Sequence, residues 1–146
     1  MRDDVTAIIA DLTRRYARKL EDLNRLLSSE QEKLHFIKSG NIDKIFELIE
    51  TDNGIIDLID LSDFEIARSE EGLARIVGTS REKLYALIGP EAAELTALRG
   101  SVGSAIGELC RLRETLADGL ETEHRQVREN IAALSRIDRL KRYLPE

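Results

Sequence analysis

Tryptophan is absent from the sequence, and aromatic residues make up only 4% of its 146 residues. A core must therefore be built mostly from Leu, Ile, Val and Ala, which suits a narrow aliphatic seam between helices. The single cysteine, Cys110, cannot form an internal disulfide, and we expect it to be a small buried side chain. Between Pro90 and Pro145 no residue breaks a helical pattern.

Several functional motifs are missing as well. The chain has no glycine-rich phosphate loop, no cysteine pair and no recognisable set of nucleophile and base, so we expect no enzymatic activity and no cofactor. Apolar runs stay well below the roughly 18 residues that a membrane span requires. Arg2, Asp3 and Asp4 lead directly into an amphipathic pattern instead of a signal peptide. We therefore expect a cytoplasmic protein.

A long basic block is also missing. The formal net charge is −6, whereas a phosphate-binding surface needs a local excess of Lys and Arg. The most basic stretch, residues 136–142, alternates its charges with Ile137 and Leu140, as a helix near its C-terminus does. We expect no nucleic-acid binding.

The residues that are present predict helices. Apolar residues make up 42% of the chain and charged ones 34%, and from Val5 to Ile37 the apolar residues recur at steps of three and four. Ser39-Gly40-Asn41 then supplies a helix stop followed by a helix start, so the next helix folds back as a hairpin. We predict a single all-α domain over residues 1–146, with helices at about 4–38, 42–77, 81–88 and 91–143. The first two helices form an antiparallel hairpin, the third is short, and the last is longer than either helix of the hairpin. Together they form a coiled-coil-like bundle.

The second helix carries two unusual features. Asn53-Gly54 lies inside it, weakens it by about 1 kcal/mol and allows a bend. The five apolar residues between Ile55 and Leu61 go almost all the way round the helix, so we expect them to be covered on more than one side, by two neighbours or by a partner. Ser80 is expected to cap the short helix that follows.

The last helix is predicted to be longer than the hairpin. About 50 residues give a rod of about 75 Å, against about 50 Å for the hairpin. The surplus apolar stripe at its end stays uncovered, and exposed apolar stripes commonly mark binding sites for partners. We expect the partner-binding residues to be Val127, Ile131, Leu134, Ile137, Leu140 and Leu144.

A row of small residues also follows this helix at steps of four and three. Such a row either lets another helix backbone approach closely, from a partner or a second copy, or merely allows the helix to bend or break. The row consists of Ala93, Ala97, Gly100, Ser104 and Gly107.

Each of the two histidines follows a glutamate by three residues. The pairs are Glu32 with His35 and Glu121 with His124. Such pairs on two helices are half of the di-iron pattern of ferritin-like bundles, and the two histidines would lie at similar heights if the last helix started level with the first. Because bridging glutamates on two further long helices are not available, we expect no metal site here.

The order of these elements resembles the FlgN-type flagellar export chaperones. The segment from Leu26 to Glu32 and the turn at Gly40 match the end of that family's first helix. Leu58, Leu61, Glu65, Arg68 and Gly78 match its second helix, and Asn130 with Leu134, Ile137 and Leu140 matches its last helix.

The resemblance implies a cytoplasmic chaperone of flagellar type III secretion. Its clients would be the C-terminal helices of hook-filament junction (hook-associated) proteins, which it would deliver to the export apparatus without binding nucleotide. Two other interpretations remain: a structural coiled-coil homodimer or scaffold that buries the surplus stripe against a second copy, and a ferritin-like metal-binding bundle.

Overall fold

The computed structural model describes the backbone of residues 3–141 and the side chains of residues 3–126, 128, 129 and 132. Every regular element in this part is helical, which confirms the all-α class. The long helices are α1 (Asp3–Ser39), α2 (Ile42–Val77) and α4 (Ala93–Lys141). Between α2 and α4 lie the short helix α3 (Leu84–Ile88) and two 3-10 turns, Arg81–Lys83 and Gly89–Glu91.

The hairpin turn forms as its sequence predicts. Gly40 adopts a left-handed conformation with φ 72°, which a residue with a Cβ rarely adopts. The Asn41 amide donates to the carbonyl of Phe36 at 2.9 Å and closes the end of α1. The Asn41 side chain then accepts from the amide of Lys44 at 3.3 Å and caps α2. Gly78, with φ 75°, ends α2 in the same left-handed way.

Three local expectations need comment. Asn53-Gly54 does not interrupt α2, which runs continuously from Ile42 to Val77. Ser80 precedes the Arg81–Lys83 turn but makes no capping hydrogen bond through its side chain. The last helix begins at Ala93 and not at position 91, because a 3-10 turn occupies Gly89–Glu91 and Ala92 leaves helical geometry.

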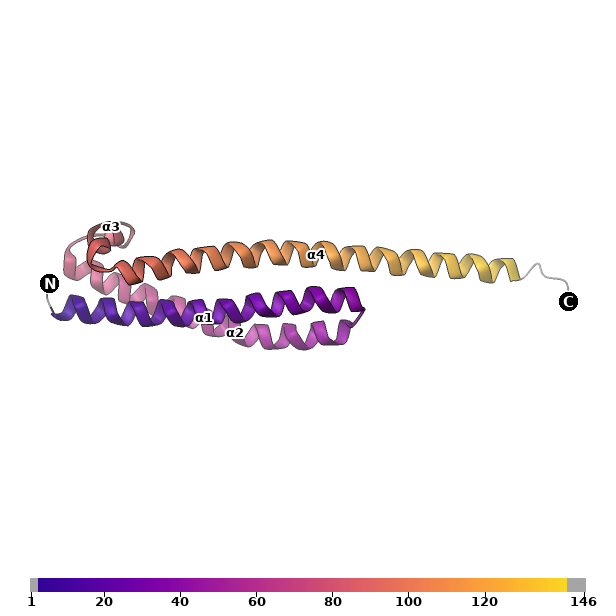
Figure 1. Cartoon of the computed structure of the whole chain (residues 1–146), viewed down its shortest axis with the longest axis horizontal. Coiled ribbons are helices and arrows are strands. Elements are labelled where there is room, and N and C mark those ends of the chain that lie inside the picture. The colour runs from indigo at the N-terminus through magenta and orange to yellow at the C-terminus, as the bar shows by residue number, and fades with distance from the viewer. Residues whose placement is uncertain (1–2, 142–146) are drawn as a thin grey trace.

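The three long helices form an elongated rod (Figure 1). α2 runs antiparallel to α1, and α4 runs parallel to α1 after the chain turns at α3. α1 packs along both α2 and α4, whereas α2 and α4 have little direct contact with each other. One side of α2 is therefore covered by α1, and apart from its contacts with α3 and the Arg81–Lys83 turn the rest of its surface faces solvent.

Burial repeats every seven residues along the seam. On α2 the buried positions Ile45, Asp52, Ile59, Ile66 and Leu73 are each seven apart. On α4 the same spacing joins Leu95, Val102 and Leu109. This period keeps one edge of each helix against its neighbour over the whole contact, as in coiled coils.

α4 continues beyond the turn of the hairpin (Figure 1). A Cβ added at Gly119 would lie 3.6 Å from the Ile37 side chain, which places Gly119 level with the last turn of α1. Residues 120–141, which we call the C-terminal arm, extend past that level for about 33 Å at ~1.5 Å per residue. The overhang expected from helix lengths thus begins near residue 120. None of the described helices is long and apolar enough to cross a membrane.

Candidate functional site

Large apolar side chains are exposed mainly on α2. Six of the nine exposed large apolar residues among the described side chains belong to this helix, and Phe46 and Phe64 keep 62% and 60% of their surface accessible. Of the two expected ways of covering the stretch after Gly54, a second neighbouring helix does not occur, because α4 packs on α1 and leaves this side of α2 open, and coverage by a partner stays a prediction. The six residues are Ile42, Phe46, Ile49, Leu58, Leu61 and Phe64.

Three of these residues lie at the hairpin turn, in the first two turns of α2. Ile42, Phe46 and Ile49 are spaced four and three apart and so share one face of the helix. Leu120 of α4 is 37% exposed. It directly follows Gly119, which lies beside Ile37, so Leu120 belongs to the same end of the rod. We call these four residues the tip patch.

Heptad spacing relates the tip-patch residues to residues near α3. Ile42, Ile49 and Glu70 share one heptad position on α2. Arg99 and Leu120 share another on α4, since they are three heptads apart. At the other end of the rod Tyr85 bonds to Glu70 while the Arg99 guanidinium lies 3.4 Å from the centre of its ring. The four tip-patch residues are exposed apolar side chains at the end of the rod where α4 continues as the C-terminal arm.

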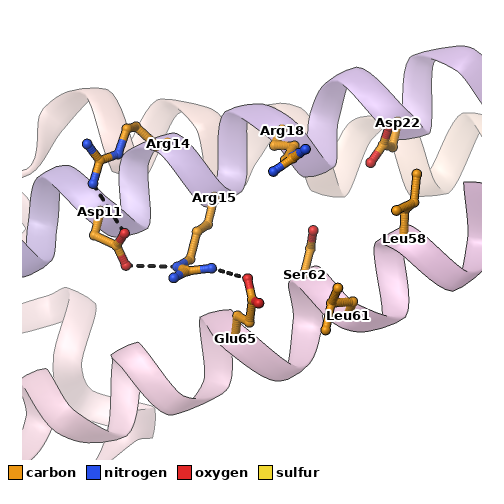
Figure 2. Close-up of a pocket in the computed structure, with 9 residues that line it drawn as sticks. All are labelled: Asp11, Arg14, Arg15, Arg18, Asp22, Leu58, Leu61, Ser62 and Glu65. Carbon is orange, nitrogen blue, oxygen red and sulfur yellow. Dashed lines mark hydrogen bonds and ion pairs between the residues drawn. The ribbon is translucent and has the colours of Figure 1, made fainter.

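A second surface lies between α1 and α2, a shallow pocket on their open side (Figure 2). Leu58 and Leu61 of α2 supply its apolar wall. Arg15 of α1 spans it, bonding to Asp11 at 2.8 Å and to Glu65 of α2. The Arg15 guanidinium holds the pKa of Asp11 below its usual value.

The arginines of this pocket are mostly neutralised by their neighbours. Arg14 also bonds to Asp11, at 3.3 Å. Arg18 is exposed and has no ion-pair partner among the described residues. The pocket is therefore a weak site for an anion, and its two leucines are its main binding surface.

Glu70 organises the turn between α2 and α4. Its carboxylate accepts hydrogen bonds from Tyr16 of α1 at 3.2 Å, from Arg81 at 3.1 Å and from Tyr85 of α3. Burial, together with the bond to Glu70, raises the pKa of Tyr85 far above its ordinary value. Sequence reasoning missed this cluster, and its arrangement of three donors around one buried carboxylate indicates a structural role.

A buried charged cluster joins all three long helices. Lys33 of α1 bonds to Glu30 at 2.8 Å and to Asp52 of α2, and the guanidinium of Arg113 on α4 lies 3.7 Å from Glu30. Lys33, Glu30 and Asp52 expose no more than 4% of their surface. Three buried oxygens nearby lack a hydrogen-bond partner: Ser29 Oγ, Glu30 Oε2 and Asp52 Oδ1. The sequence did contain a sign of this cluster, because Glu30, Lys33 and Asp52 occupy heptad positions at which core residues lie.

The predicted row of small residues faces solvent. Ala93, Ala97, Gly100, Ser104 and Gly107 are all exposed. A Cβ at Gly100 or Gly107 would meet nothing within 4 Å, so no described helix approaches this row. α4 is continuous through it. Cys110 is also exposed, contrary to expectation, because it lies off the buried edge of α4.

The predicted stripe, Val127, Ile131, Leu134, Ile137, Leu140 and Leu144, lies outside the side chains that the structure describes.

Both glutamate-histidine pairs are exposed. His35 packs on Phe36, and Glu121 lies 3.8 Å from Arg125. The two histidines do not share a height: α4 is level with the end of α1 at Gly119, which puts His124 on the C-terminal arm and His35, with Glu32, before that end. No group of three metal-ligating side chains occurs within the described part of the chain.

No protein-family model, curated protein or solved structure matches this chain.

Proposed function

We propose that this protein binds amphipathic helices of other proteins, as a cytoplasmic chaperone of flagellar type III secretion. Its clients in this proposal are the C-terminal helices of hook-filament junction proteins, which it holds until the export apparatus receives them. The client class comes from the resemblance of the sequence to FlgN-type chaperones. The binding mode comes from the exposed apolar surface.

The observation that supports helix binding is the tip patch and its position. Ile42, Phe46 and Ile49 expose 42%, 62% and 39% of their surface at the point where α1 ends and α4 continues alone. An amphipathic helix laid here would pack against α2 on one side and against the C-terminal arm on the other. This is helix-in-groove recognition, which uses apolar anchors at steps of three and four.

The energetics suit a chaperone that must release its client. Burying about 600 Å² of apolar surface stabilises a complex by ~15 kcal/mol before costs. The loss of rotational freedom and the ordering of both partners offset most of that gain. The proposed complex is therefore moderate in affinity and reversible.

A co-purification experiment tests the proposal. The double change Leu134→Asp with Ile137→Asp on the arm, and separately Phe46→Asp with Ile49→Asp in the tip patch, should each abolish binding of a junction protein's C-terminal segment. Circular dichroism should show unchanged helicity. The matched control is Ala117→Asp with Ala132→Asp, which adds the same charge to α4 at exposed positions and should bind normally. Normal binding by both double variants would reject the assignment.

A further inference from the structure

The outer surface of α2 is acidic as well as apolar. Between Ile42 and Phe64 the sequence has seven acidic residues and one basic residue. Asp43, Glu50 and Asp57 are seven apart, which aligns them along one ridge, and all three are exposed. None of them forms an ion pair with another described residue. The helix therefore presents apolar side chains beside a row of uncompensated carboxylates.

Most of the C-terminal arm has the complementary composition. The arm as a whole has five basic and four acidic residues, but Glu121 and Glu123 precede Arg125, and from Arg125 to Lys141 five basic residues outnumber two acidic ones. Apolar residues recur at helical spacing in that part. Arg128 is exposed and has no ion-pair partner among the described side chains. The arm and the exposed stretch of α2 also match in length. Residues 120–141 and residues 42–64 each span about 33 Å as helices.

The arm of one copy cannot reach its own α2. α4 is one continuous helix that runs parallel to α1 and leads away from the hairpin beyond Gly119 (Figure 1). A second copy placed tip to tip and pointing the opposite way has its α2 alongside this arm. The arrangement is two-fold symmetric, so the same contact forms twice and closes the assembly at two copies.

We propose that two copies of this chain pair tip to tip, with the basic C-terminal arm of each lying along the acidic and apolar outer face of the other's α2. In this pairing the arm, whose sequence supplies arginines and apolar residues, covers the exposed carboxylates and Phe46 on the outer face of α2. The pairing does not depend on the proposed client. A client and a second copy would both bind the C-terminal arm, so they cannot bind at the same time.

Charge reversal in the full-length purified protein, without any client, tests this pairing. The first variant changes the ridge by Asp43→Lys, Glu50→Lys and Asp57→Lys, and the second changes the arm by Arg128→Glu, Arg136→Glu and Arg139→Glu. Light scattering should give twice the chain mass of 16.5 kDa for the unchanged protein and the single-chain mass for each variant. An equimolar mixture of the two variants should return to the doubled mass, because both contacts in the mixed pair are again complementary.

The control reverses three exposed charges at the α3 end, by Glu82→Lys, Glu91→Lys and Glu94→Lys, and should leave the doubled mass unchanged. Circular dichroism establishes that every variant is folded. An unchanged protein that stays single at all concentrations, variants that stay paired, or a mixture that fails to pair would each overturn the proposal. A client that fails to bind would overturn the proposed function but not this pairing.

Discussion

The ammonium group of Lys33 on α1 bonds to the carboxylate of Asp52 on α2 inside the helical seam. Both side chains are almost fully buried, and Glu30 supplies a second carboxylate to the same ammonium group. Each occupies a position that the heptad pattern reserves for an apolar residue. Charged groups at such positions lower stability compared with apolar ones but fix the register in which the helices pair.

Removing the ammonium group should be strongly destabilising. Lys33→Ala leaves Asp52 buried without a counter-charge and Glu30 with only the Arg113 guanidinium at 3.7 Å, and breaking a buried ion pair in this way costs about 3–5 kcal/mol. Urea unfolding followed by circular dichroism measures the loss. The control is Lys44→Ala, whose exposed pair with Glu47 at 3.2 Å should be worth no more than about 1 kcal/mol.

Replacing the whole cluster should have the opposite outcome. Glu30→Leu, Lys33→Met and Asp52→Leu together remove all three buried charges of this cluster on α1 and α2, and such replacements are commonly neutral or stabilising by about 1–4 kcal/mol. The same urea experiment checks this. A triple variant as unstable as Lys33→Ala would show that the cost of Lys33→Ala is a packing loss and not an unpaired charge.

Stability should fall at high pH because of Tyr85. Burial and the bond to Glu70 raise the pKa of Tyr85 in the folded protein above its ordinary value of 10.0. Above about pH 10 the unfolded chain therefore releases this proton while the folded chain keeps it, so stability is full below that pH and declines as the pH rises. Thermal unfolding between neutral and strongly alkaline pH measures the decline. Tyr85→Phe should flatten it, and an equal decline in this variant would assign the effect to other groups.

Replacement by alanine should have opposite effects on stability at Gly54, inside α2, and at Gly78, directly after its end. Gly78→Ala should destabilise by about 1 kcal/mol, because its φ of 75° is strained for a residue with a Cβ. Gly54→Ala should stabilise by a similar amount, because Gly54 lies inside the helix and its Cβ would enter open space. Thermal unfolding of the two variants checks the pair. A loss of stability in Gly54→Ala would mean that the residue's freedom is needed in the folded state.

The local signals in the sequence were sufficient for the helices. Periodic apolar residues predicted the bounds of α1 and α2 to within one residue. Gly40 and Gly78 end the two helices and Asn41 caps α2, as these residue types favour. These features depend on backbone conformation and on neighbours within one turn, which a single sequence contains. The prediction of helix bounds was least accurate near Gly89-Pro90, where a 3-10 turn delays the start of α4 to Ala93.

The neighbour that covers each helix could not be predicted from these local patterns. Ile59 is buried while Leu58 and Leu61 beside it are about half exposed, although all three are apolar and lie in one helix. Lys33 and Asp52 are buried although their residue types predict exposure.

The sequence by itself therefore determined where helices begin and end, and that their combined apolar surface exceeds what the seam can hide. Only the tertiary structure decided that α1 lies against both α2 and α4, that the uncovered surface includes the outer face of α2, and that α4 leaves the hairpin near Gly119. The physical reason is that the burial of a side chain depends on which distant helix stands opposite it. Local spacing sets the face on which a residue lies, but not the neighbour that this face meets.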